Sequence, residues 1–75
     1  MQLTEGDIMT VAKITEITST SPKSFDEAVR GGIKRATKTL KNVTGAWIQD
    51  QEVEVKNGKI SEYRVRLKVT FILTD

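Results

Sequence analysis

The chain has 75 residues, with 12 Lys or Arg, 10 Asp or Glu, a net charge of +2, and neither His nor Cys. A single domain of this length buries only about 60% of the surface that its unfolded form exposes, so its own core is small. Disulfides and zinc sites, two common sources of extra stability, need Cys or His. The remaining common source is self-association, and we therefore expect a homo-oligomer.

The same absences exclude most kinds of catalytic site. Without Cys or His the chain has no thiol nucleophile, no imidazole base and no His-based metal centre, so we do not expect an enzyme. The longest mostly apolar run, Val65 to Leu73, is interrupted by Arg66 and Lys68, which predicts no membrane span, and no signal peptide is recognised. These features indicate a cytoplasmic protein that does not bind membranes.

The N-terminal part of the chain begins without a regular pattern. Residues 1–8 show no apolar period and are expected to be a loose leader, which leaves one domain over residues 9–75. Val11 to Thr18 is rich in β-branched residues and predicts a first strand. The Ser, Thr and Pro residues of 19–23 predict a loop.

A helix is expected to begin after Ser24. Ser24 and Glu27 have the spacing of a capping box, in which the serine hydroxyl accepts from the Glu27 amide and the Glu27 carboxylate accepts from the Ser24 amide. The helix is expected to end near Lys41, and its apolar stripe consists of Phe25, Ala28, Val29, Gly32, Ile33, Ala36 and Leu40. Gly32 in this stripe predicts a close approach of helix and sheet, with a kink as the alternative.

The rest of the chain has the pattern of a long hairpin. A second strand over about 45–56 and a third over 59–74 flank Asn57-Gly58, the sequence of a two-residue type I′ turn. An unbroken register from this turn predicts the cross-strand pairs Lys56–Lys59, Val53–Glu62, Gln51–Arg64, Gln49–Arg66 and Trp47–Lys68, unless a bulge shifts them. The third strand alternates between an apolar set facing the helix (Tyr63, Val65, Leu67, Val69, Phe71, Leu73) and a polar set on the other face (Glu62, Arg64, Arg66, Lys68, Thr70).

These elements predict an α+β fold of β-α-β-β connectivity. The helix reverses the chain direction, so placing the third strand in the middle gives an antiparallel three-stranded sheet of order 1-3-2, with one face under the amphipathic helix. A helix of about 17 residues is roughly 25 Å long, whereas a strand of about 15 residues is roughly 50 Å. The hairpin tip with Val53, Val55 and Ile60 is therefore expected to protrude, and other copies of the chain are its natural cover.

Trp47 is the residue that points most directly to a function. The predicted register places it on the face away from the helix, beside Gln49, Gln51, Arg64, Arg66 and Lys68. An indole there could stack on a flat ring whose polar edge and phosphate bind the amide and cationic groups. Two alternatives remain open: the indole packs in a subunit contact, or a bulge turns it inward.

The charged residues have simpler explanations than a binding site. Arg64, Arg66 and Lys68 form a basic row that could follow a nucleic-acid backbone, but nearby carboxylates more often neutralise such a row, and we expect no nucleic-acid partner. Asp26 and Glu27 fit helix capping better than metal binding. The hydroxyl residues of 19–24 could hold an anion, but they lack the glycines of a phosphate loop.

The sequence resembles the dodecin family over residues 9–75. The resemblance is carried by the helix opening Ser-Pro-Lys-Ser-Phe-Asp-Glu-Ala and by the final strand Glu-Tyr-Arg-Val-Arg-Leu-Lys-Val-Thr-Phe. It implies a β-α-β-β fold assembled into a hollow homododecamer of cubic symmetry. It also implies storage or buffering of a flavin, FMN or riboflavin, stacked on tryptophan, with coenzyme A as a further ligand in some members.

The sequence departs from the family pattern at the flavin site. Gly45 stands at the position of the usual tryptophan, with Trp47 two residues later, and Arg64 stands at the position of a glutamine. We expect a site rebuilt around Trp47 for stacking, Gln49 and Gln51 for the polar edge, and Arg64 with Arg66 or Lys68 for phosphate. The alternative is a dodecin-like shell without a flavin site, in which Trp47 is a subunit contact and coenzyme A or metal ions are the ligands.

Overall fold

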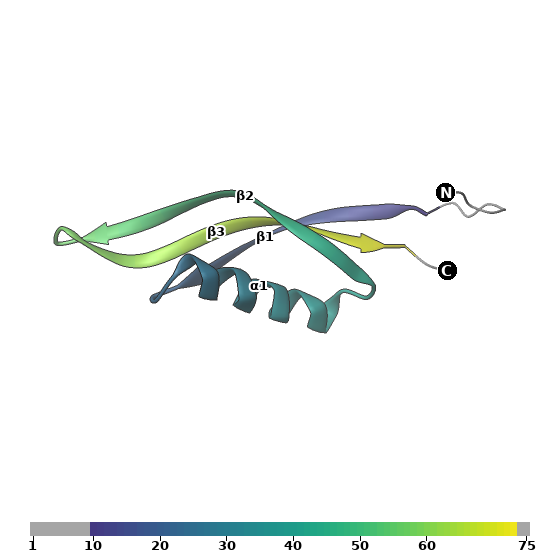
Figure 1. Ribbon diagram of the computed structural model, residues 1–75, viewed down its shortest axis with the longest axis horizontal. Helices are drawn as coiled ribbons and strands as arrows, with labels where there is room; N and C mark the ends of the chain where they lie inside the picture. Colours follow the sequence, from purple (N-terminus) through teal and green to yellow (C-terminus); the bar gives the residue numbers. More distant parts are fainter. Residues whose placement is uncertain (1–9, 74–75) are drawn as a thin grey trace.

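Three strands and one helix form a two-layer unit in the computed structural model, which describes residues 10–73 (Figure 1). The elements are β1 (Ala12–Ser21), α1 (Phe25–Thr39), β2 (Val43–Lys56) and β3 (Lys59–Ile72). Both partners of the central strand β3 are antiparallel to it, and the sheet order is β1-β3-β2. The predicted connectivity, strand order and strand directions are confirmed. The predicted leader, residues 1–8, lies outside the described residues.

The core lies between α1 and the middle of the sheet. Val65, Leu67 and Val69 of β3 are fully buried, and the buried face of α1 consists of Ala28, Gly32 and Ala36. The larger members of the helix stripe, Phe25, Val29, Ile33 and Leu40, pack around this centre, as the periodicity predicts. Phe25 meets Tyr63 edge to face, with ring centroids 5.1 Å apart. The sheet face away from α1, which we call the outer face, carries the polar residues of β3.

The helix covers only part of the sheet. The chain extends 59 Å along its longest axis, whereas a 15-residue helix is about 22 Å long at 1.5 Å per residue. Figure 1 shows the β2–β3 hairpin projecting beyond one end of α1, while the start of β1 and the end of β3 project beyond the other. Val55 and Ile60 on the projecting hairpin are 58% and 49% exposed, as predicted, whereas Val53, the third residue of the predicted tip, is half-buried.

Ser24 caps the helix, but only half of the predicted capping box forms. The Ser24 hydroxyl accepts a hydrogen bond from the Glu27 amide at 3.0 Å. The Glu27 carboxylate accepts a hydrogen bond from the Ser21 hydroxyl instead of the Ser24 amide, and the Ser21 oxygen in turn accepts from the Lys23 amide at 2.9 Å. The hydroxyl loop that could have held an anion thus contains a carboxylate of the chain itself.

Removal of the Ser24 hydroxyl tests this cap. Ser24→Ala leaves the Glu27 amide without its acceptor and is expected to lower the free energy of unfolding by about 1 kcal/mol. Urea unfolding at one fixed chain concentration measures the change, because oligomer stability depends on concentration. Lys23→Ala is the control, because Lys23 is exposed and its hydrogen bond to Ser21 uses the backbone amide, which alanine keeps. Equal losses for the two variants would contradict the capping role.

Candidate functional site: the outer face around Trp47

Three bulges decide which residues share the outer face. Lys56 pairs with Lys59 across the Asn57-Gly58 turn, whose φ angles of 55° and 75° confirm the predicted left-handed turn. The register then shifts between Glu54 and Val55, returns between Ile48 and Asp50, and shifts once more between Val43 and Gly45. Because the first two shifts compensate, Trp47 pairs with Lys68 as predicted, whereas the predicted pairs between them are wrong.

The corrected register changes the set of residues near Trp47. Val53 pairs with Tyr63 and not with Glu62, and Gln51 pairs with Val65. Since paired residues of antiparallel strands point to the same face, Gln51 lies on the face that carries α1, away from Trp47. Gln49 pairs with no β3 residue, because it is the extra residue of the second bulge. The predicted pairs Gln51–Arg64 and Gln49–Arg66 are therefore wrong, and the outer face has Glu52 and Asp50 opposite these arginines.

The indole of Trp47 lies on the outer face and remains accessible. Its partner Lys68 belongs to the polar set of β3, and Trp47 is 50% exposed. This excludes the alternative in which a bulge turns the indole under α1. Gly45, two residues away on the same strand, pairs with Thr70, and a Cβ placed on it would meet no atom within 4 Å. Trp47 therefore has open space beside it on the same face.

Every cation of the predicted basic row has a carboxylate partner. Arg66 contacts Asp50 at 2.8 Å and Glu52 at 2.7 Å through its two terminal nitrogens. Arg64 contacts Glu62 at 3.1 Å and Glu52 at 3.5 Å. Lys68 lies 3.4 Å from Glu16 of β1. Three cations thus meet four carboxylates, and the row is not a free cationic track for a nucleic-acid backbone.

Hydrogen bonds to Asp50 and Glu52 also raise the pKa of Arg66 above its ordinary value. A pKa raised by folding stabilises the folded state wherever the guanidinium is protonated, and that contribution is lost only as the pH rises through the folded pKa. Arg66 therefore stays charged and paired at neutral pH. A phosphate at this position would have to compete with two carboxylates of the chain.

A groove borders Trp47 on the other side of β2. This α1–β2 groove has a volume of about 640 Å³ and is lined mainly by apolar residues, among them Val29, Ile33, Ile48 and Leu67. Ile48 is 46% exposed in it. Trp47 thus lies at an edge strand between a charged face and an apolar groove, and both surroundings are compatible with an aromatic contact.

A metal centre is not preformed in the described part of the chain. The carboxylates of the outer face point to the arginines and to Lys68, and no group of three or more Asp or Glu within residues 10–73 is arranged to hold a metal ion. Glu16, the carboxylate partner of Lys68, was not among the residues predicted for this face. The β1–β3 pairing of Glu16 with Lys68 follows from strand alternation once the register of β1 is known.

No helix within residues 10–73 has the length and apolar character needed to cross a membrane.

Comparisons with known proteins give a consistent result. The family model described as Dodecin matches residues 11–74. A curated relative, calcium dodecin from Mycobacterium tuberculosis, is 34% identical over 64 residues, which cover 84% of this chain and 89% of the relative. The structure of dodecin from Streptomyces davaonensis has a TM-score of 0.83 at 33% identity, covering 88% of this chain and 97% of that chain. The structure of the Mycobacterium tuberculosis calcium dodecin, described as having a novel calcium-binding site, has a TM-score of 0.74 at 32% identity, covering 85% and 91%.

Proposed function

We propose, because the chain belongs to the dodecin family, that it assembles into a homododecameric shell that binds and stores a flavin without acting on it as an enzyme. The observation that best supports a flavin as the ligand is the half-exposed indole of Trp47 on a polar sheet face. An aromatic residue beside charged groups is the arrangement that stacks on a flat heteroaromatic ring. The single small domain with exposed apolar ends supports the assembly.

Gly45 supports the same site. It lies next to Trp47 on the outer face and has no atom within 4 Å of a Cβ position, so a ring stacked on the indole has room to extend over β2. Gly45 stands where the family resemblance expects the tryptophan, and Trp47 is displaced from it by two residues, or about 7 Å along the strand. The proposed site is therefore the family's sheet face with the aromatic residue moved by one strand repeat.

With the corrected register, the proposed ligand-binding residues are not equally well supported. Trp47 remains the stacking residue, and Gln49, at the bulge, remains the amide proposed for the ring edge. Arg64, Arg66 and Lys68 remain candidates for phosphate, but their carboxylate partners oppose that role. Riboflavin, which has no phosphate, should therefore bind at least as tightly as FMN. We do not retain coenzyme A, whose phosphates would need the same cations.

Titration with riboflavin and FMN tests the proposal. Trp47 is the single tryptophan of the chain, so its fluorescence reports directly on the site. We expect strong quenching by riboflavin and an equal or weaker effect of FMN. Unchanged emission up to high micromolar riboflavin would contradict the flavin site, and tighter binding of FMN would contradict the secondary role given to the cations.

A calcium-binding shell without flavin is the second candidate. It is favoured by the similarity to a relative named calcium dodecin and by the carboxylates Asp50, Glu52 and Glu62 on the outer face. Calcium prefers six to eight oxygen ligands, which this face could supply only if the arginines released their carboxylates or if other copies contributed more oxygens. A calcium-dependent rise in melting temperature, absent with magnesium and absent in Glu52→Gln, would support this function over flavin storage.

A further inference from the structure

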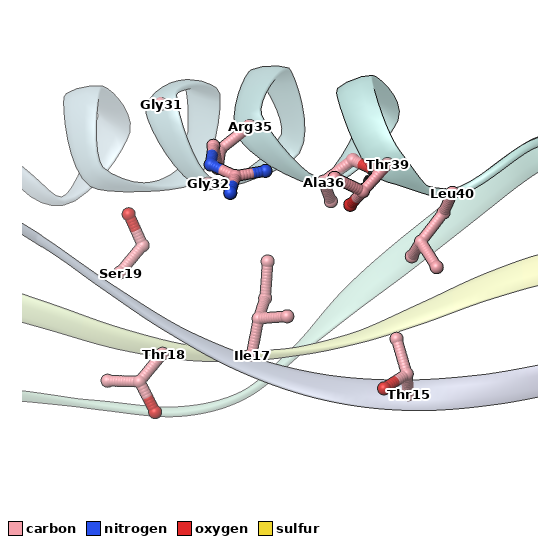
Figure 2. A pocket seen from close by; sticks show the side chains of 10 residues that line it. All are labelled: Thr15, Ile17, Thr18, Ser19, Gly31, Gly32, Arg35, Ala36, Thr39 and Leu40. Atoms are coloured by element: carbon pink, nitrogen blue, oxygen red, sulfur yellow. Dashed lines mark hydrogen bonds between the residues drawn. The ribbon is translucent and has the colours of Figure 1, made fainter.

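A second groove lies between α1 and β1, on the side of the helix away from Trp47. This α1–β1 groove has a volume of about 470 Å³, and its apolar part is formed by Ile17, Ala36 and Leu40. Figure 2 shows the Ser19 hydroxyl pointing from β1 towards the helix and the Arg35 guanidinium lying on the side of α1 that faces β1. The groove thus combines an apolar surface with a cation on the helix side.

Arg35 lacks a counter-charge among the residues that the structure describes. Arg30, Arg64 and Arg66 each form an ion pair with a carboxylate, whereas Arg35 forms none with any residue in 10–73. Arginine is one of the residues enriched at the energetic centres of protein interfaces, and its guanidinium can bind a partner's carboxylate through two parallel hydrogen bonds.

Glu54 is a carboxylate without a cation partner among the described residues, as Arg35 is a cation without a carboxylate partner. Within residues 10–73 its side chain forms no ion pair or hydrogen bond, and it faces Glu62 across the sheet. Like charges directly opposite each other destabilise a strand pair, and Glu62 is already paired with Arg64. A cation from outside the chain would therefore stabilise Glu54.

The residues next to Glu54 supply the apolar half of a contact. Val55 and Ile60 pair with each other at the projecting tip, and both are about half exposed. Neighbouring residues of a strand point to opposite faces, so Val55 and Glu54 can contact the two walls of a groove at the same time. At the other exposed apolar end, where Val11 meets Leu73, the nearby charged residue within 10–73 is Lys13, a cation.

We propose that the β2–β3 hairpin tip of one copy of the chain docks in the α1–β1 groove of a second copy. Val55 and Ile60 pack on the β1 wall of the groove around Ile17, and Glu54, on the opposite face of the hairpin, forms an ion pair with Arg35 on the α1 wall of the second copy. This inference rests on the proposed self-assembly and names one of its contacts. The contact joins different surfaces of the two copies and is therefore head to tail. Successive copies joined in this way form a finite assembly only if they close into a ring.

Charge reversal tests the contact in the full-length chain. Arg35→Glu and Glu54→Arg each place like charges in the contact and are expected to raise the chain concentration at the midpoint of assembly by about tenfold or more. The double variant Arg35→Glu/Glu54→Arg restores opposite charges and should recover the wild-type mass. An equimolar mixture of the two single variants should recover it in part. Native mass spectrometry and light scattering read the mass, and circular dichroism checks folding.

Lys34 provides the matched control. It neighbours Arg35 on α1, is exposed and does not line the groove, so Lys34→Glu should leave the mass unchanged and Lys34→Glu/Glu54→Arg should not restore assembly. Unchanged mass in both Arg35→Glu and Glu54→Arg, or equal rescue by the Lys34 double variant, would overturn the contact. If a charge-reversed variant does not fold, a double-mutant cycle of Arg35→Ala and Glu54→Ala replaces the charge reversals. Strictly additive effects of these two substitutions on the assembly midpoint would overturn the contact. A monomeric wild-type chain would instead overturn the proposed assembly itself.

Discussion

Gly32→Ala is expected to lower the free energy of unfolding by about 1–3 kcal/mol, the usual effect of overpacking a core. A Cβ added at Gly32 would lie 2.9 Å from the Ser19 Cβ and 3.1 Å from Leu67 Cδ1. Ser19 is held by the β1–β3 ladder and Leu67 is fully buried, so neither can move away without shifting the strand or the core. The loss outweighs the gain of about 1 kcal/mol that alanine normally has over glycine within a helix.

Gly31→Ala is the matched control on the preceding residue. A Cβ at Gly31 would meet no atom within 4 Å, so the helix-propensity gain is not offset, and the free energy of unfolding should rise by up to about 1 kcal/mol. Urea unfolding at one fixed chain concentration gives both values. Equal and favourable effects of the two substitutions would show that α1 does not approach the sheet as closely as the structure indicates.

The close approach at Gly32 is one of the features that could be predicted from sequence. Gly32 lies in an apolar stripe whose neighbours one turn away are Ala28 and Ala36, and all three are buried. Three small residues in the buried row of a helix leave little except close packing as an explanation. The sheet order was predictable for a similar reason, since a helix connection and a two-residue turn leave few ways to pair three strands.

The bulges of the hairpin could not be placed in the same way. Asn57-Gly58 fixes the register only next to the turn. The first bulge, where Ser61 of β3 is left without a partner between Ile60 and Glu62, changes it after two pairs. The physical reason is visible once the partners are known. Without the bulge, Val53 would face Glu62 on the polar side; with it, Val53 lies beside Tyr63 and Glu52 reaches Arg64. The extra residue at Gln49 then returns Trp47 to the outer face.

The ion pairs of the outer face show how an error in the strand register changes the predicted site. A one-residue shift exchanges the two faces of a strand, so the unbroken register placed Gln51 beside Arg64 where the structure has Glu52. The unbroken register therefore predicted amides opposite the two arginines, whereas the structure has carboxylates there. The expectation that nearby carboxylates neutralise the basic row is confirmed. The predicted position of Trp47 on the outer face is correct because two bulges lie between it and the turn and compensate each other.

Trp47→Ala is expected to lower riboflavin affinity by about 5- to 150-fold, which corresponds to the 1–3 kcal/mol usual for stacking of a base on an aromatic side chain. The native mass and melting temperature should remain those of the wild type, because the half-exposed indole contributes little to the core of its own chain. Trp47→Phe keeps a stacking surface and should retain part of the affinity. Since the variants lack the indole, the quenching of flavin fluorescence replaces tryptophan emission as the measurement.

Ile48→Ala separates the two surfaces that meet at Trp47. Ile48 is the next residue of β2, is similarly exposed and faces the α1–β2 groove instead of the outer face. It should therefore leave riboflavin affinity unchanged. If Trp47 is instead a subunit contact, Trp47→Ala will lower the melting temperature and the native mass, and riboflavin will not bind to the wild type. A loss of riboflavin affinity alone thus assigns the indole to a ligand site, and a loss of melting temperature and native mass assigns it to a contact with a neighbouring copy.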